Sequence, residues 1–120
     1  SESDIISIDA EIPSKFLAPN VWEIVDIFAP YGFGNEPLIF LMHDVPIAQI
    51  QIVGKGKPGH VKMLIEAGGY RWPALFWNAA DQIGKNFEQG DQISLIFQLS
   101  RSYYQQVETL QLNILELERK

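Results

Sequence analysis

The feature that most constrains the fold of this chain is an alternation of apolar and polar residues from Ile47 onward. An apolar residue at every second position is typical of β-strands that bury one face. The apolar positions of these runs are, in chain order, Ile50 and Ile52; Val61, Met63 and Ile65; Ile93, Leu95, Phe97 and Leu99; and Leu110, Leu112 and Ile114. The pattern predicts a mainly β domain.

Turn-forming residues separate the first three predicted strands. Residues 54–59 read Gly-Lys-Gly-Lys-Pro-Gly and form the first connection. Gly68 and Gly69 accept the positive φ angles of a two-residue hairpin turn, so they are expected to join the second and third strands. The third strand spans residues 70–77, where Pro73 lacks an N–H donor and indicates an edge or a bulge.

The order of elements after the third strand points to a particular fold. The alternation stops between residues 78 and 90, where Asn78 is expected to cap a short helix. Two further strands follow, separated by a polar, aromatic loop at residues 101–109. Three strands, a helix and two strands is the order of an OB-fold, a five-stranded Greek-key barrel. A small β-sandwich is the alternative, and the helix signal favours the barrel, which we place at residues 47–120.

Residues 1–46 are predicted to form an acidic lead-in to the barrel. Apolar residues recur at helical spacing from Val21 to Phe28, and Asn20 is placed to cap that helix, so we expect a helical N-terminal extension. A glycine-rich turn at residues 31–37 and a short strand at residues 38–42 complete the segment.

Charge is unevenly distributed along the 120 residues, whose net charge is −6. Residues 1–36 carry seven acids and one lysine, and residues 72–120 carry six acids and four bases. Residues 37–71 carry four bases against two acids, which makes them the basic part of the chain. A generic nucleic-acid-binding domain is usually basic overall, so any such function has to depend on this middle segment.

Several classes of protein are excluded or disfavoured by composition. The chain has no cysteine, which excludes disulfides, thiolate metal sites and cysteine nucleophiles. No apolar run is long enough to span a membrane, and no signal-peptide pattern is present, so we expect no membrane association and a cytoplasmic location. The chain begins at Ser1 instead of methionine, and we therefore expect that it is processed or is cut from a longer protein.

No catalytic or metal site is predicted. His43-Asp44 is an adjacent pair of possible ligands, whereas divalent ions need three or more converging ones, so we expect a turn there. The glycine- and lysine-containing segment 54–59 lacks the spacing of a nucleotide-binding P-loop and does not precede a helix.

The nucleic-acid-binding candidates lie where OB-folds bind oligonucleotides, in the loops after strands one and four and on strands two and three. Loop lysines neutralise phosphates, and exposed aromatic side chains stack on bases. Alternation sends Trp72 and Trp77 to opposite faces, and a core role is expected for at least one tryptophan. The alternative is that the lysine and arginine side chains are ordinary solvent-facing charges and that the tyrosines pack across the barrel mouth. The candidates are Lys55, Lys57, Lys62, Arg71, Trp72, Tyr103 and Tyr104.

Several short motifs also resemble the C-terminal OB domain of RecJ-type single-stranded-DNA exonucleases. The most specific is Pro30-Tyr31-Gly32-Phe33-Gly34-Asn35, which is similar to that family's Pro-Phe-Gly-x-Gly-Asn turn. The weaker ones are Ile8-Asp9-Ala10-Glu11-Ile12, Glu36-Pro37-Leu38-Ile39-Phe40, His60-Val61-Lys62, Gly90-Asp91-Gln92-Ile93, Tyr103-Tyr104 and Leu110-Gln111-Leu112. Through the His-Leu-Lys motif of the family, His60 joins the candidate binding residues. The turn lacks the proline that usually follows its asparagine, and the loop before the last strand differs in composition.

The resemblance implies a parent enzyme that degrades single-stranded DNA from the 5′ end in repair and recombination. Its Asp-His-His clusters would bind Mn²⁺ or Mg²⁺ in an upstream catalytic core, and no Asp-His-His sequence occurs in this chain. This chain would then be a non-catalytic module that holds single-stranded DNA, weakly when isolated, beside that core. The alternative is a protein-interaction module whose acidic face docks the catalytic core or a replication or repair partner.

Overall fold

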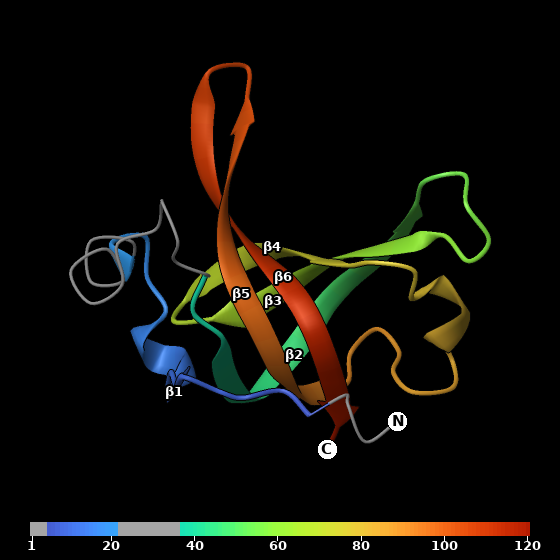
Figure 1. Cartoon of the computed structure of the whole chain (residues 1–120), viewed down its shortest axis with the longest axis horizontal. Coiled ribbons are helices and arrows are strands. Elements are labelled where there is room, and N and C mark those ends of the chain that lie inside the picture. Colours follow the sequence, from blue (N-terminus) through green and yellow to red (C-terminus); the bar gives the residue numbers. More distant parts are fainter. Residues whose placement is uncertain (1–4, 22–36) are drawn as a thin grey trace.

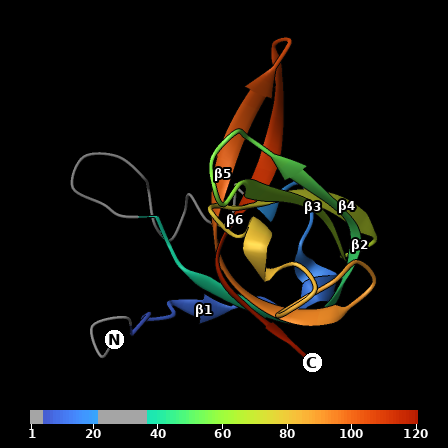
Figure 2. The same cartoon turned by 90° about the vertical axis from the view of Figure 1, so that its right-hand side faces the viewer.

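The computed structural model describes residues 5–21 and 37–120, without the side chains of residues 102–104. Its main body is a closed β-barrel (Figure 1). Five strands run in the order β2-β3-β4-β6-β5, and an additional β2–β5 pairing closes the ring, which Figure 2 shows from a second direction. The strands are β2 (Phe40–Val53), β3 (His60–Ala67), β4 (Tyr70–Phe76), β5 (Gln92–Tyr104) and β6 (Val107–Arg119).

The topology of this barrel is that of the predicted OB-fold. Neighbouring strands are antiparallel except for β4 and β6, which pair in parallel at Ala74↔Leu112 and Leu75↔Asn113. A parallel pairing between the third and the last barrel strand is what the Greek-key connection requires. The OB-fold prediction is therefore confirmed, and the β-sandwich alternative is excluded by the β2–β5 closure.

The first barrel strand is longer than the sequence pattern suggests, because a bulge interrupts its alternation. Phe40 and Met42 are buried, and the next buried positions are Val45 and Ile47, so the inward parity changes at residues 43–44. Asp44 has a φ of 57°, a left-handed conformation that aspartate tolerates better than most residues. Strand β2 pairs with β5 on both sides of this bulge, from Phe40 to Pro46, and with β3 from Ile47 to Val53. The barrel thus begins at Phe40, and residues 40–46, which we expected in the lead-in, are part of β2.

The core follows the predicted alternation. The runs in β3, β5 and β6 point inward as expected, and Trp72 and Ala74 of β4 join them. Ile52 is an exception: 60% of its surface is exposed, because β2 continues beyond the barrel toward the 54–59 loop. The fully buried side chains include Leu17, Met42, Ile47, Val61, Met63, Ile65, Phe87, Ile93, Leu95, Phe97 and Leu112.

The connection between β4 and β5 contains a short 3₁₀ helix, Ala80–Gln82, so the short helix expected between residues 78 and 90 is present as a single 3₁₀ turn. Asn78 does not cap it, because its own backbone is left-handed with a φ of 56°. Gly84, with a φ of 86°, turns the chain again before a helix can continue. Phe87 then fills the barrel end, fully buried, and fixes the course of the connection.

The described part of the lead-in packs at the start of β4, beside Gly68, and carries no long helix. Strand β1 (Ala10–Glu11) pairs in parallel with β2, and one 3₁₀ turn, Ser14–Phe16, follows it. Leu17 and Val21 are buried against the barrel. The expected helix at Val21–Phe28 lies outside the described residues beyond Val21, as does the turn at residues 31–37, and the described residues give the helical extension no support. No helix in the described ranges has the length and apolar character to cross a membrane.

The last two strands form a long hairpin that projects from the barrel (Figure 1). The expected loop at residues 101–109 is wrong, because ladder pairing continues to Tyr104↔Val107. Gln105 and Gln106 both have positive φ angles, 51° and 67°, and form a two-residue turn. The sequence alternation fades here because the ribbon extends past the core, as the 59% exposure of Val107 shows. The predicted Gly68-Gly69 turn is confirmed, with φ angles of 62° and 83°.

Candidate nucleic-acid interface

The outward face of β3 and β4 forms the centre of the candidate interface. Strand register places Lys62 opposite Leu75, Leu64 opposite Pro73, and Glu66 opposite Arg71 on this face. On the β2 side, the exposed amide side chains Gln51 and Gln49 lie opposite Lys62 and Leu64. On the β6 side, Asn113 lies opposite Leu75 and accepts a 3.0 Å hydrogen bond from Gln111. The face is therefore built from amide and apolar side chains, with Lys62 near one end and the Glu66–Arg71 pair at the other.

The loop at residues 54–59 carries Lys55 and Lys57 at one end of this face, and both are exposed. The base of the loop is fixed, because Gly59 is buried and its carbonyl accepts a 3.0 Å hydrogen bond from the backbone N–H of Ala80. Within the part of the chain that the structure describes, neither lysine, nor Lys62, forms an ion pair. Three ammonium groups are thus available to an anionic ligand at this end.

His60 and Trp77 form an aromatic pair beside the lysine loop. The Nδ1 atom of His60 accepts a 2.9 Å hydrogen bond from the backbone N–H of Asn78. The imidazole meets the Trp77 ring edge to face, with ring centroids 4.6 Å apart. Trp77 remains 56% exposed. The sequence alternation placed Trp77 and Trp72 on opposite faces of the strand, but Trp77 was not selected as a site residue. Its odd spacing from an inward-facing Trp72 was the signal that it faces outward.

Trp72 is buried in the barrel, in agreement with the core role expected for one tryptophan. It is 5% exposed, and its indole N–H donates a 2.9 Å hydrogen bond to the carbonyl of Ala67. The ring therefore presents too little surface for a base to stack on it. As a candidate binding residue it contributes only an edge to a surface hollow.

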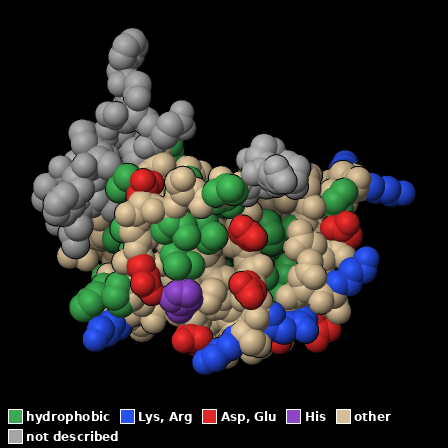
Figure 3. Space-filling model, turned by 60° about the horizontal axis from the view of Figure 1, so that its bottom comes forward, with side chains coloured by type: hydrophobic (Ala, Val, Ile, Leu, Met, Phe, Trp, Pro, Cys, Tyr) green, Lys and Arg blue, Asp and Glu red, His purple; other side chains and the backbone are tan. Residues whose placement is uncertain are grey.

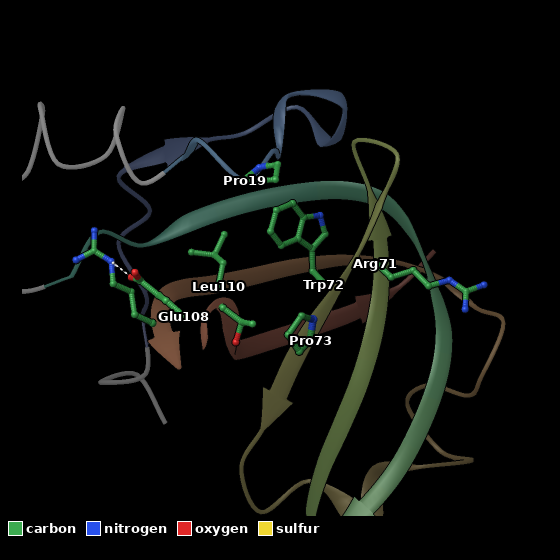
Figure 4. A pocket seen from close by; sticks show the side chains of 8 residues that line it. Pro19, Arg71, Trp72, Pro73, Glu108 and Leu110 are labelled. Carbon is green, nitrogen blue, oxygen red and sulfur yellow. Dashed lines mark ion pairs between the residues drawn. The ribbon is translucent and has the colours of Figure 1, made fainter. Parts of the chain in front are cut away.

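That hollow lies between β4 and β6 and has a volume of about 470 Å³ (Figure 4). It forms because the two strands pair only at residues 74 and 75 and then diverge toward the base of the hairpin. Two ion pairs reduce the charge of its rim: Arg71 with Glu66 at 3.2 Å, and Arg101 with Glu108 at 2.9 Å. In Figure 4 the Arg71 side chain points away from the hollow. Its lining residues are Pro19, Arg71, Trp72, Pro73, Arg101, Glu108, Thr109 and Leu110.

The candidate residues separate into two groups along β4. Lys55, Lys57, His60 and Lys62 lie toward its C-terminal end, whereas Arg71 and Trp72 lie near its start, beside the hairpin. Trp77 is six positions after Arg71 in the sequence, about 20 Å along an extended strand. Tyr103 and Tyr104 belong to the projecting end of β5, and their side chains lie outside the described part. The lysine loop and the hairpin project from the same side of the barrel in Figures 1 and 2.

The described residues contain no group of three or more histidine, cysteine, aspartate or glutamate side chains that could hold a metal ion. His43 contacts Ser94 at 2.9 Å and Glu11 at 3.4 Å, and Asp44 pairs with Lys120 at 3.2 Å. These contacts bring His43 close to one carboxylate, that of Glu11, and Asp44 close to a lysine.

Several solved structures have a fold similar to that of this chain. RecJ from Thermus thermophilus in complex with Mn²⁺ matches with a TM-score of 0.61 and 19% identity, over 96% of this chain and 16% of that one. Its complex with Mg²⁺ also gives 0.61 and 19%, over 96% of this chain and 17% of that one. The second single-stranded-DNA-binding protein (SSBb) of Mycobacterium smegmatis matches with a TM-score of 0.56 and 12% identity, over 68% of this chain and 84% of that one.

At these identities the structural matches establish the fold, and this chain spans only about a sixth of the length of the RecJ chains. None of the curated proteins matches the sequence. The family model that describes the RecJ OB domain matches residues 8–116, which is nearly the whole chain. The chain therefore belongs to the RecJ OB domain family.

Proposed function

We propose that this domain binds single-stranded DNA across the outward face of β3 and β4, between the lysine loop and the β5–β6 hairpin. The observation that carries the proposal is the group of exposed lysines, Lys55, Lys57 and Lys62, none of which is neutralised by a described carboxylate. The likeness in fold to proteins named as single-stranded-DNA-binding supports it.

The chemistry of the face favours binding without sequence preference. Lysine ammonium groups neutralise phosphates and do not read bases, and the neighbouring Gln49 and Gln51 amides can hydrogen-bond to any nucleotide. The path of about 20 Å along β4 suits a few nucleotides, at the lower end of OB-fold site sizes. The net charge of −6 opposes a polyanion at long range, so we expect weak binding by the isolated domain.

In its wider context, we propose that the domain holds the substrate strand for a RecJ-type 5′-to-3′ exonuclease that acts in repair and recombination. Catalysis and its Mn²⁺ or Mg²⁺ ions would belong to a core outside these 120 residues. The family match and the small share of the RecJ chains that this chain spans support that division of labour.

The test is fluorescence anisotropy with labelled oligo-dT at several salt concentrations. Each phosphate contact on a single strand contributes about −0.7 to the slope of log K against log salt. Replacing Lys55 and Lys57 together by alanine should weaken binding and flatten that slope by about 1.4. The matched control replaces Lys15 and Lys85, two exposed lysines outside this face, and should leave the slope nearly unchanged. Equal effects of both double variants, or no binding by the wild-type domain at low salt, would contradict the proposal.

A second candidate function, protein interaction, is favoured by a different face of the barrel. A hollow of about 280 Å³ on β2, β5 and β6 combines the apolar side chains Leu41, Ile96 and Leu117 with Glu116 and Glu118. Figure 3 shows hydrophobic side chains flanked by acidic ones and a histidine on the lower side of the molecule. Such a surface suits a partner that presents apolar and basic side chains, such as a catalytic core.

This second function is tested by calorimetric titration of the domain with the separately purified catalytic core. Reversing charge with the double substitution E116K/E118K should abolish binding that depends on this face, whereas K55A/K57A should leave it intact. If neither double variant changes the affinity, the interaction proposal is wrong for this surface.

A further inference from the structure

Trp77 is a large aromatic side chain exposed within the proposed DNA-binding face. More than half of its surface, 56%, is open to solvent, at a point where β4 has just ended. Most of the other bulky side chains of β4 and its neighbours are inside the barrel. Ile52, 60% exposed, lies beside Gly59 at the base of the same loop. The lysine end of the face therefore carries apolar surface that the fold does not use.

The position of Trp77 is fixed by its neighbours. The His60 ring packs against it, and the Asn78 N–H holds His60 by donating to Nδ1, which leaves the imidazole proton on Nε2. Asn78 follows Trp77 directly, so the backbone group that binds His60 belongs to the residue next to the exposed ring. A tryptophan ring held in this way loses little conformational entropy when a ligand stacks on it.

The same histidine also contacts the lysine loop. A Cβ atom added at Gly54 would lie 2.9 Å from Cδ2 of His60, so the loop backbone passes directly over the imidazole. Gly54 has a φ of 85°, a left-handed conformation that glycine adopts freely. Loop, histidine and tryptophan are therefore one packed unit, in which the loop that carries Lys55 and Lys57 is linked through His60 to an exposed aromatic ring.

We propose that Trp77 is a stacking platform for an unpaired nucleobase of the bound strand, supported by His60 as a positioning residue. The inference rests on the proposed single-stranded-DNA binding and assigns it a particular side chain. Stacking on an aromatic ring is available to every base, because each has a flat π-face, but not to bases already stacked within a duplex. Lysine contacts hold the backbone on one side of the unit, and Trp77 holds a base on the other.

The experiment measures the binding of this 120-residue chain and its variants to labelled oligo-dT by anisotropy. Replacing Trp77 by alanine should lower affinity about 5- to 150-fold, the range seen for alanine at stacking positions, without changing the salt slope. Replacing it by phenylalanine should retain most of the affinity. Tyr70, 49% exposed at the far end of β4, provides the matched control, and its alanine variant should bind more tightly than the Trp77 variant.

A backbone that lacks bases isolates the stacking contribution. With an oligonucleotide made of abasic residues, the wild type and the Trp77→Ala variant should bind equally, because no base is present to stack. In the wild type, oligo-dT should quench tryptophan fluorescence, and the Trp77→Phe variant should lose most of that quenching. Thermal unfolding of each variant verifies that it is folded.

The outcomes separate this inference from the function on which it rests. If Lys55 and Lys57 matter for binding but Trp77→Ala binds oligo-dT as tightly as the wild type, the stacking role is wrong and DNA binding stands. If Trp77→Ala weakens binding to the abasic strand as much as to oligo-dT, the residue acts through structure and the inference is also overturned. If the wild type binds neither strand, both proposals fail.

Discussion

Gly68 and Gly69 form the β3–β4 turn and provide a matched test of how the lead-in packs on the barrel. Both have positive φ angles, 62° and 83°. A Cβ atom added at Gly69 would meet nothing within 4 Å, whereas one at Gly68 would collide with the backbone carbonyl of Leu17. The two positions therefore carry similar backbone strain and differ in their contacts with the lead-in, at Leu17 and at the carbonyl of Ser14.

The magnitudes follow from this difference. Gly69→Ala should cost about 1–2 kcal/mol, the strain of one left-handed L-residue. Gly68→Ala carries the same strain and also has to displace the segment that holds Leu17, which is fully buried. Loss of a buried leucine contact costs about 2–5 kcal/mol, so Gly68→Ala should cost about 3–7 kcal/mol if the segment undocks.

Urea unfolding followed by circular dichroism measures both variants. With an m-value of about 2 kcal/mol/M for a domain of this size, Gly69→Ala should lower the midpoint by about 0.5–1 M and Gly68→Ala by clearly more. Removing residues 1–21 should abolish the difference, because the Leu17 carbonyl that the added methyl group would strike is then absent. Equal midpoints for the two variants in the full chain would refute the packing of Leu17 against this turn.

Two further substitutions test the core and the site. Phe87→Ala should destabilise the domain by about 3–5 kcal/mol in urea unfolding, because this fully buried ring closes the barrel end, whereas Val107→Ala at the exposed hairpin should change stability by less than about 0.5 kcal/mol. Trp72→Phe should cost about 1–3 kcal/mol, because a buried carbonyl loses its indole partner, yet oligo-dT affinity should be unchanged. Weaker DNA binding by a folded Trp72→Phe variant would show that the buried ring contributes to the interface.

Part of the candidate site was predictable from the sequence because loop position and charge are local properties. Lys55 and Lys57 lie in a segment whose glycines and proline exclude a helix or a central strand, and both are exposed in the structure. The choice between Trp72 and Trp77 was not predictable. It depends on which side of β4 faces the barrel, and that side is set by pairing with β3, where Trp72 lies opposite the buried Ile65.

The errors in the predicted fold have local causes that a period of two does not reveal. A bulge at Asp44 shifts the alternation by one residue, so one bent strand looked like two separate segments. Beyond the core, the β5–β6 ribbon has no buried face to enforce alternation, and its strands looked like a loop. The helix expected after Asn78 is limited to one 3₁₀ turn, because left-handed residues, Asn78 and Gly84, turn the chain before and after it.

The sequence by itself determined the inward-facing sets of β3, β5 and β6, the Gly68-Gly69 turn and the strand order typical of an OB-fold, because each depends on neighbouring residues. Only the tertiary structure decided the closure between β2 and β5, the parallel contact of Ala74 with Leu112, and the exposed aromatic pair of His60 and Trp77. These features depend on the register between strands that are distant in the chain. Local periodicity specifies which face of a strand is buried, but it does not specify which strands pair with it along its two edges.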